Sequence, residues 1–335
     1  MKNKTLFVFI NLQHFATQTT LLPGLSDEMK TYYEDRLIDL AEPKLVHDQF
    51  GDKYPIPQNG GKTIEFRKYD SLPKATTPIT EGVTPAGNSL NVTTITAEVT
   101  QYGDYIQLSD VLQLTAIDNN VVQATKLLGS QAGRTLDSIT RDVLAGGTNV
   151  IRVGNKGTRA ALTAQDTLTP EVFYQAATQL AAMNADYIDD SYVAIIHPYA
   201  KYDLIRSNEW MDVHKYTDAG ADMIYEGEIG KLGNIRFVES TEAKIWNDNT
   251  CPSDGASGHL AVFGTLVLGA HAYGVTEVTG GGLQHIVKQL GYGDDPLNQR
   301  ASVGWKAIKT AERLVEQYMV RIESTSAYST KAAAN

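Results

Sequence analysis

The sequence predicts an α+β chain, and three patterns carry this prediction. Two β-type runs, at residues 63–69 and 90–106, flank a proline-containing middle that has no helical period. From residue 121 to residue 143, apolar side chains recur every three or four positions, which predicts a long amphipathic helix. Residues 300–323 alternate between apolar and polar side chains, so strands return late in the chain. We therefore expect late strands to pair with early elements, so that two lobes interleave in sequence.

Residues 1–50 are predicted to form an N-terminal arm. The opening residues resemble a signal peptide, but their apolar run is shorter than a usual signal-peptide core, and no small-residue cleavage motif follows. We therefore expect the arm to be retained and to dock on another subunit through Phe7, Phe9 and Phe15, because burying each such side chain contributes roughly 1.5–3 kcal/mol. No later run approaches the roughly 20 apolar residues that span a bilayer, so we expect no membrane partner.

Residues 51–109 are predicted to form an extended β-hairpin loop. A two-stranded ribbon is barely stable alone in water, so its surface is expected to lie on a neighbouring molecule, as in an assembly protein. Charges of both signs alternate along this loop, which indicates either ion pairs across a subunit boundary or simply a solvated face. On the first interpretation, the candidate contact residues are Arg67, Lys68, Lys74 and Glu81.

The long helix is expected to begin with Asp118 as its N-cap and to end at Gly146-Gly147. At 1.5 Å per residue such a helix is about 40 Å long. Its apolar positions fall on one stripe, so the helix is expected to pack on a sheet along one side. The stripe comprises Val121, Ala124, Leu128, Ala132, Leu136, Ile139 and Val143.

The body that follows is predicted to mix helices and strands. A second helix has Thr169 as N-cap and Pro170 at its first position, and residues 192–197 form a continuous apolar strand that should be covered on both faces. This second helix is expected to bury Phe173, Ala176, Ala177, Leu180 and Met183. Further elements are expected at residues 199–207 (helix) and at 235–239, 259–269 and 273–278 (strands).

Composition constrains the class of protein. The chain has 335 residues, which suits one large domain or two closely mixed ones. Its formal net charge of −10 is opposite in sign to that of a protein built to grip a phosphate backbone. The single cysteine, Cys251, excludes an intrachain disulfide framework and suits a reducing cytosol. Its polar loop is typical of a surface thiol.

Motifs for catalysis and for cofactor or metal binding are incomplete. Residues 59–63 look like the end of a phosphate-binding loop, but Ile56 stands where that pattern needs glycine. Ser71 and Lys74 have the spacing of an acyl-enzyme pair, but a proline lies between them. His197 reads as a strand-end residue before a helix-starting proline. We therefore predict no catalytic, cofactor or metal site, although a cytosolic hydrolase with an unrecognised site stays open as an alternative.

Four segments resemble a family of tailed-bacteriophage major capsid proteins (the Caudoviricetes major head proteins): residues 54–116, His197-Pro198, Tyr225–Glu242 and Asp295–Trp305. The resemblance runs from about residue 28 to about residue 324, and its motifs combine glycine, proline and aromatic residues in a fixed order. It implies the tailed-phage capsid fold, with the N-terminal arm and extended loop above, a peripheral domain with a long spine helix, and an axial domain. The peripheral domain would comprise residues 110–165 and 286–335, and the axial domain residues 166–285.

The resemblance also implies a function. A member of this family is a major capsid protein that self-assembles into hexamers and pentamers of an icosahedral head around double-stranded DNA. The negative net charge is tolerable in a shell that must enclose DNA without adhering to it. The implied partners are many copies of the same chain, a scaffolding protein, a portal, DNA bound without sequence specificity and, as a possible addition, a decoration protein. No cofactor is implied. The expected location is the virion, assembled in the cytoplasm of a bacterial host.

Two alternatives to this function stay open at the level of sequence. One is the shell of a bacterial nanocompartment, which has the same fold and encloses an enzyme instead of DNA. The other is the cytosolic hydrolase already mentioned.

Overall fold

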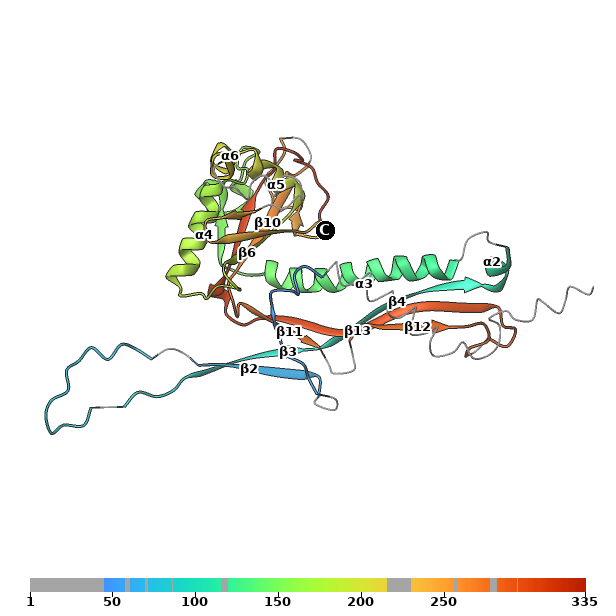
Figure 1. Ribbon diagram of the computed structural model, residues 1–335, viewed down its shortest axis with the longest axis horizontal. Coiled ribbons are helices and arrows are strands. Elements are labelled where there is room, and N and C mark those ends of the chain that lie inside the picture. Colours follow the sequence, from blue (N-terminus) through green and yellow to red (C-terminus); the bar gives the residue numbers. More distant parts are fainter. Residues whose placement is uncertain are drawn as a thin grey trace, which may run out of the picture.

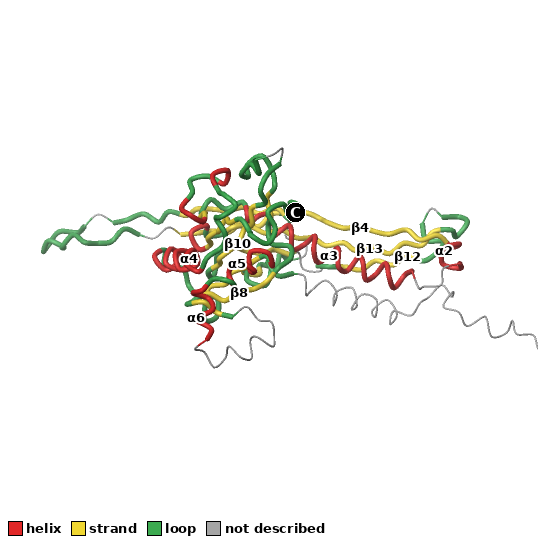
Figure 2. The backbone as a smooth tube through the Cα atoms, turned by 90° about the horizontal axis from the view of Figure 1, so that it is seen from above, coloured by secondary structure: helices red, strands yellow, loops and turns green. Residues whose placement is uncertain are grey.

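The computed structural model describes residues 45–57, 61–69, 72–85, 87–115, 120–215, 230–255, 258–277, 282–293 and 295–335. The molecule is elongated, with a compact lobe that contains the C-terminus, a long sheet covered by one helix, and a ribbon that projects away from that sheet (Figure 1). The view from above shows the ribbon and the long sheet extending in opposite directions from the lobe (Figure 2). The described strands form three sheets, one in each of these parts.

The long sheet is organised around β13 (Arg300–Arg313). Along one edge β13 pairs antiparallel with β4 (Thr100–Ser109) over its first ten residues. Along the other edge it pairs with β12 (Gln284–Lys288) and then with β11 (Tyr273–Glu277), which is extended by the short β1 (Asp52–Lys53). The late alternating segment thus pairs with an early strand, as the sequence predicts.

Helix α3 (Asn120–Ala145) covers one face of this sheet. Four predicted stripe residues of α3 are buried against Val303, Trp305 and Ala307 of β13: Ala124, Leu128, Ala132 and Leu136. The packing on a sheet and the end of the helix before Gly146 are confirmed, whereas the Asp118 cap lies outside the described residues. In the last two turns the predicted stripe is only partly buried: Ile139 packs with the same cluster and Val143 is half-buried. The polar side chains of Asp137, Thr140 and Arg141 are buried there as well.

Helix α2 (Asp110–Thr115) follows β4 directly, at the end of the long sheet farthest from the lobe. The Ser109 hydroxyl accepts a hydrogen bond from the Leu112 N–H (3.2 Å), and the Asp110 N–H donates to the Gln299 carbonyl (3.1 Å). These bonds satisfy polar groups at the start of the helix and tie it to the turn before β13.

The compact lobe is a mixed sheet with the order β5-β14-β10-β6-β8-β7, and β9 also pairs with β10. Its strand β6 is completely buried, as its continuous apolar sequence predicts. Three helices cover one face, and their core includes Phe173, Leu204 and Trp210. The bounds are β5 Val150–Arg152, β6 Tyr192–Ile196, β7 Lys231–Leu232, β8 Ile235–Glu239, β9 Ile245–Trp246, β10 Val262–Leu268, β14 Met319–Ser324, α4 Pro170–Ala182, α5 Pro198–Ile205 and α6 Asn208–Lys215.

A second apolar cluster joins the lobe to the long sheet. The opposite face of the lobe's sheet contributes Val193, Ile195 and Leu266, and these residues pack with Leu144 of α3 and Tyr273 of β11. The C-terminal end of α3 is therefore fixed between the two sheets. In the lobe, α4 begins after Thr169 as predicted, although the Thr169 side chain makes no capping bond. The prediction of a buried Met183 is wrong, because this residue follows the last turn of α4 and is 43% exposed.

The ribbon consists of β2 (Thr63–Tyr69) and β3 (Val92–Glu98), paired antiparallel from Thr63–Glu98 to Tyr69–Val92. The run at residues 90–106, predicted as one strand, is two strands that separate at Val99. Val99 is buried, and its N–H donates to the Lys62 carbonyl (2.9 Å), while the next residue begins β4. The chain therefore leaves the ribbon at this point and enters the long sheet.

Candidate assembly surfaces

The base of the ribbon is anchored in its own subunit, whereas the rest of the ribbon is exposed. Phe66 packs edge-on against Tyr54, with ring centroids 5.0 Å apart, and Ala97 is buried. Beyond Tyr69 and Val92, the described residues up to the tip form no strand and are all exposed. Large apolar side chains are among them: Leu72, Ile79, Val83 and Leu90, which are 54–76% exposed. Such side chains on an extended loop are typical of an interaction surface.

The structure exposes all four predicted charged contact residues of the loop. Arg67 and Lys68 lie near the outer end of β2, and Lys74 and Glu81 lie in the tip. Within the described part of the chain, none of the four makes an ion pair, so their charges are available to another molecule. Phe7, Phe9 and Phe15 lie outside the described residues, and their contacts stay a prediction.

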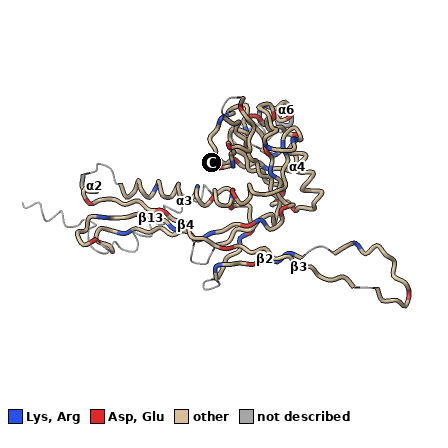
Figure 3. The backbone as a smooth tube through the Cα atoms, turned by 180° about the vertical axis from the view of Figure 1, so that it is seen from behind, with Lys and Arg blue, Asp and Glu red and all other residues tan. Residues whose placement is uncertain are grey.

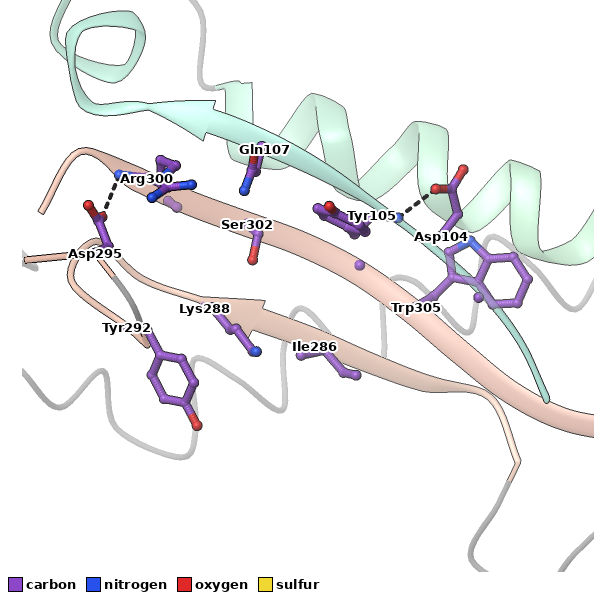
Figure 4. A pocket seen from close by; sticks show the side chains of 13 residues that line it. Asp104, Tyr105, Gln107, Ile286, Lys288, Tyr292, Asp295, Arg300, Ser302 and Trp305 are labelled. Carbon is purple, nitrogen blue, oxygen red and sulfur yellow. Dashed lines mark hydrogen bonds between the residues drawn. The ribbon is translucent and has the colours of Figure 1, made fainter.

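The sequence analysis did not identify a groove on the face of the long sheet opposite α3 (Figure 4). Three rows of cross-strand neighbours line up on this face, and the central row is Tyr105 of β4, Gly304 of β13 and Ile286 of β12. A Cβ atom on Gly304 would lie 2.8 Å from the Tyr105 Cβ atom, so the strand pair needs glycine here. The missing side chain leaves a hollow between Tyr105 and Ile286, within a cavity of ≈ 590 Å³.

The outer part of the groove carries positive and aromatic side chains. Lys288 lies over the ring of Tyr292, 5.0 Å from its centroid, and Arg300 lines the same cavity. The two acidic residues of the cavity are held by their own chain. Asp104 accepts hydrogen bonds from Gln131 (2.6 Å) and the Tyr105 N–H, and the Arg300 N–H donates to Asp295 (2.7 Å), which lowers the pKa of Asp295. Figure 3 shows basic positions along this sheet.

The most strongly charged buried site lies in the compact lobe, at Glu323 of β14. This carboxylate is fully buried and contacts Arg152 (2.9 Å), Arg159 (2.7 Å) and Arg321 (3.0 Å). Arg321 also donates to the Ala145 carbonyl at the end of α3 and to the Gly147 carbonyl just after it. Burial alone would raise the pKa of Glu323, but the three guanidinium groups outweigh burial and lower it. Every charged group here is engaged in holding β5, β14 and α3 together, which is a structural role.

We expect Glu323→Gln to lower the free energy of unfolding by about 3–5 kcal/mol at pH 7, because it leaves the buried Arg321 and the half-buried Arg152 and Arg159 without their carboxylate. A lowered folded-state pKa stabilises the wild type above the ordinary carboxyl pKa of about 4.3, and this advantage is lost as the pH falls through the folded value. Urea unfolding should therefore show a large difference between the two proteins at pH 7 and a smaller one in acid. Exposed Glu98→Gln is the control, and a gap that widens in acid would contradict the assignment.

Two residues that the sequence analysis weighed for chemistry are structural. His197 caps α5, because its Nδ1 accepts a hydrogen bond from the Tyr199 N–H (3.1 Å), and burial lowers its pKa. Cys251 was predicted to be a surface thiol, and this is wrong. Cys251 is 3% exposed, it packs with Leu162 and Val262, and burial raises its pKa, which disfavours the reactive thiolate.

A search of the described residues finds no group of three or more histidine, cysteine or acidic side chains arranged to hold a metal ion. Among the same residues, none of the helices is both long enough and apolar enough to cross a membrane.

Solved structures with a similar fold are viral and virus-like shells. The capsid of cyanophage P-SCSP1u matches with a TM-score of 0.64 and 17% identity, over 84% of this chain and 89% of the other. The capsid of Ralstonia phage GP4 matches with a TM-score of 0.63 and 16% identity, over 86% and 90%. A virus-like particle from Pyrococcus furiosus matches with a lower TM-score of 0.51 and 9% identity, over 88% and 99%.

No protein-family model matches the chain, and no curated protein matches it in sequence. The similarity to known proteins that the comparisons find is therefore a similarity of fold. The fold agrees with these capsids over most of the chain. The chain has the α+β fold of tailed-phage major capsid proteins.

Proposed function

We propose that this chain is the major capsid protein of a tailed phage, and that many copies form the hexamers and pentamers of an icosahedral head around double-stranded DNA. The observation that carries the proposal is the combination of a capsid fold with a projecting loop whose apolar and charged side chains have no partner in the described part of their own chain. A closed shell requires contacts between different surfaces of neighbouring copies, and a loop that reaches beyond its own subunit provides such a contact.

The groove opposite α3 is the proposed docking site for the loop tip of a second copy. The tip is extended, carries Pro73, Pro78 and Pro85, and contains the acidic Glu81. Extended proline-rich segments bind to grooves lined by aromatic residues, and this groove contains the exposed Tyr105 and Tyr292. Its cations, Lys288 and Arg300, complement Glu81 in charge. Pairing of Glu81 in the tip with Lys288 in the groove would set the register of the contact.

A charge exchange tests this contact. We expect Glu81→Lys to reduce the yield of complete shells by roughly tenfold or more, since about 1.4 kcal/mol lost at one contact is a factor of ten. Lys288→Glu should have a similar effect, and the double variant should recover most of the yield because each copy supplies both surfaces. Exposed Glu209→Lys on α6 is the control. Shell yield is measured by sedimentation and negative-stain microscopy, and a double variant no better than the single ones would refute the pairing.

The remaining assignments are part of the same proposal. The predicted peripheral domain (residues 110–165 and 286–335) would hold α3 and the long sheet, and the predicted axial domain (residues 166–285) the compact lobe, with the bounds adjusted for β5 and β14, which pair within the lobe's sheet. Of the predicted arm (residues 1–50), residues 1–44 would contact another subunit. The scaffolding protein, the portal, a decoration protein and assembly in the host cytoplasm also belong to it. The net charge of −10 supports enclosure of DNA without tight binding.

A second candidate function is a nanocompartment shell, favoured by the match to the virus-like particle from Pyrococcus furiosus. Its lower TM-score makes this the weaker candidate. Native particles should decide between the two. Particles that contain double-stranded DNA support the phage head, whereas closed particles that contain protein and no DNA support a nanocompartment. Purified native chain that forms no particles under any condition would contradict both.

A further inference from the structure

Residues 45–50, here called the wedge, lie between the second half of α3 and the sheet beneath it. Over its first half, α3 packs directly on β13. From Asp137 onward, the wedge adds to the direct contacts that Ile139 and Leu144 make with the two clusters. Leu45 packs with the α3–β13 cluster, and Val46 and Phe50 pack with the cluster that contains Leu144 and Tyr273. The wedge therefore fills the space between the sheet and the buried polar positions Asp137 and Thr140 of α3.

Polar contacts hold the wedge on both sides. His47 is fully buried, and Asp137 of α3 accepts a hydrogen bond from its backbone N–H (2.7 Å) and contacts its Nδ1 atom (2.6 Å). One oxygen of Asp48 accepts from the Thr140 hydroxyl of α3 (2.6 Å), and the other is paired with the buried Lys309 of β13. The carboxylate of Asp48 thus bridges the helix and the sheet.

The contacts on the sheet side extend this network. The Tyr273 hydroxyl of β11 donates to the His47 carbonyl, and Lys309 also donates to the Leu136 carbonyl of α3 (3.1 Å). The Tyr273 hydroxyl keeps its proton, since burial raises its pKa well above the ordinary value. If the wedge left this position, Asp137 and Lys309 would be buried without their partners, which is strongly unfavourable. Withdrawal of the wedge and separation of α3 from the sheet are therefore coupled events.

We propose that the wedge is a conformational device that locks the second half of α3 onto the sheet when it is inserted and releases it when it is withdrawn. Buried charges make such an element two-state, because an intermediate position leaves them unpaired. The wedge continues directly into residues 1–44, the predicted arm. Under the proposed function, on which this role rests, a neighbour that binds the arm in one position shifts the population of the two states. The wedge would then couple a contact between subunits to the position of the long helix.

Hydrogen exchange on the unassembled full-length protein tests the device. In Asp48→Asn, we expect amide exchange to rise tenfold or more at residues 137–145, with residues 121–132 of α3 and strand β10 unchanged. Lys309→Met added to Asp48→Asn should bring exchange back toward the wild type, because the unpaired buried charge is gone. Ser138→Ala is the control, since Ser138 lies on the same half of α3 and its hydroxyl donates to the Arg134 carbonyl of its own helix rather than to the wedge.

Thr140→Val is the milder variant if Asp48→Asn does not fold, because it removes one hydrogen bond to Asp48 and keeps the shape of the side chain. It should raise exchange in the same residues by a smaller factor. Exchange that rises evenly along α3, or that does not change in either variant, would overturn the proposal. Hydrogen exchange is measured on the unassembled protein and needs no shell. A negative result would therefore contradict the role of the wedge alone, whereas the images of native particles test the proposed function.

Discussion

Replacing Leu128 with aspartate is expected to abolish soluble folded protein. Leu128 is 1% exposed and packs between α3 and the long sheet, in the cluster that contains Val303 and Trp305. Losing a buried leucine side chain costs about 2–5 kcal/mol, and burying an unpaired carboxylate costs several kcal/mol more. The sum is comparable with the roughly 5–15 kcal/mol that stabilises a typical domain. Leu136→Asp is expected to act in the same way, because Leu136 is 4% exposed in the same cluster.

The neighbouring residues provide matched controls for this prediction. Leu127 is 66% exposed and Lys126 is exposed, so Leu127→Asp and Lys126→Asp should leave soluble protein at the level of the wild type. Leu127→Asp is the sharper control, because it makes the same chemical change one residue away on the opposite side of the helix. Expression followed by fractionation and circular dichroism measures the outcome. If Leu128→Asp and Leu127→Asp are equally soluble, α3 does not pack on the sheet through this face.

Deleting residues 70–88 is expected to leave a folded, soluble subunit that forms no regular shells. The described residues of this segment are exposed, and the backbone hydrogen bonds among them close short-range turns, such as that from the Val83 N–H to the Thr80 carbonyl. The deletion joins Tyr69 to Ser89, which leaves three residues before Val92, the partner of Tyr69 in the ribbon. Three-residue loops close antiparallel hairpins, so the register of β2 and β3 can be kept.

Two measurements separate folding from assembly in the deletion. The thermal unfolding midpoint of the unassembled subunit should match that of the wild type, while sedimentation and microscopy should show no closed particles. A chain in which residues 72–85 are replaced by glycine and serine at constant length is the control for loop length, and it should also fail to assemble. A deletion that does not fold would show that the tip belongs to the core. A deletion that builds normal shells would exclude the tip from the contacts between subunits.

The candidate surfaces differ in how far the sequence could predict them. Arg67, Lys68, Lys74 and Glu81 were named as contact residues because charges of both signs alternate along a loop expected to reach a neighbour, and the structure exposes all four. No local sequence pattern indicated the groove. Tyr105, Ile286 and Gly304 are far apart in sequence, and only the pairing of β4, β13 and β12 brings them into one row. The charge contact between Glu81 and the groove is a proposal that neither sequence nor structure tests.

By itself, the sequence determined the elements whose side-chain period matches their backbone period. These include the extent of β2, the completely buried β6, the end of α3 before Gly146 and the position of α5 after His197. The rule that a local pattern predicts an element is sufficient here, because β2 alternates, β6 is a continuous apolar run, and glycine or proline marks one end of α3 and α5. The tertiary structure alone decided where that rule fails. Val99 divides an unbroken β-type run because the two halves pair with different partners, β2 and β13.

Buried polar groups are the clearest case in which the local sequence does not predict the structure. Asp137, Thr140 and Cys251 look like surface residues because charged, hydroxyl and loop side chains usually face water. They are buried because partners from distant segments satisfy or cover them, such as His47 and Asp48 of the wedge for the two residues of α3. Burial of a polar group depends on a partner that the local sequence does not contain. Pattern therefore determined the elements of this protein, and long-range pairing decided which polar residues became part of its core.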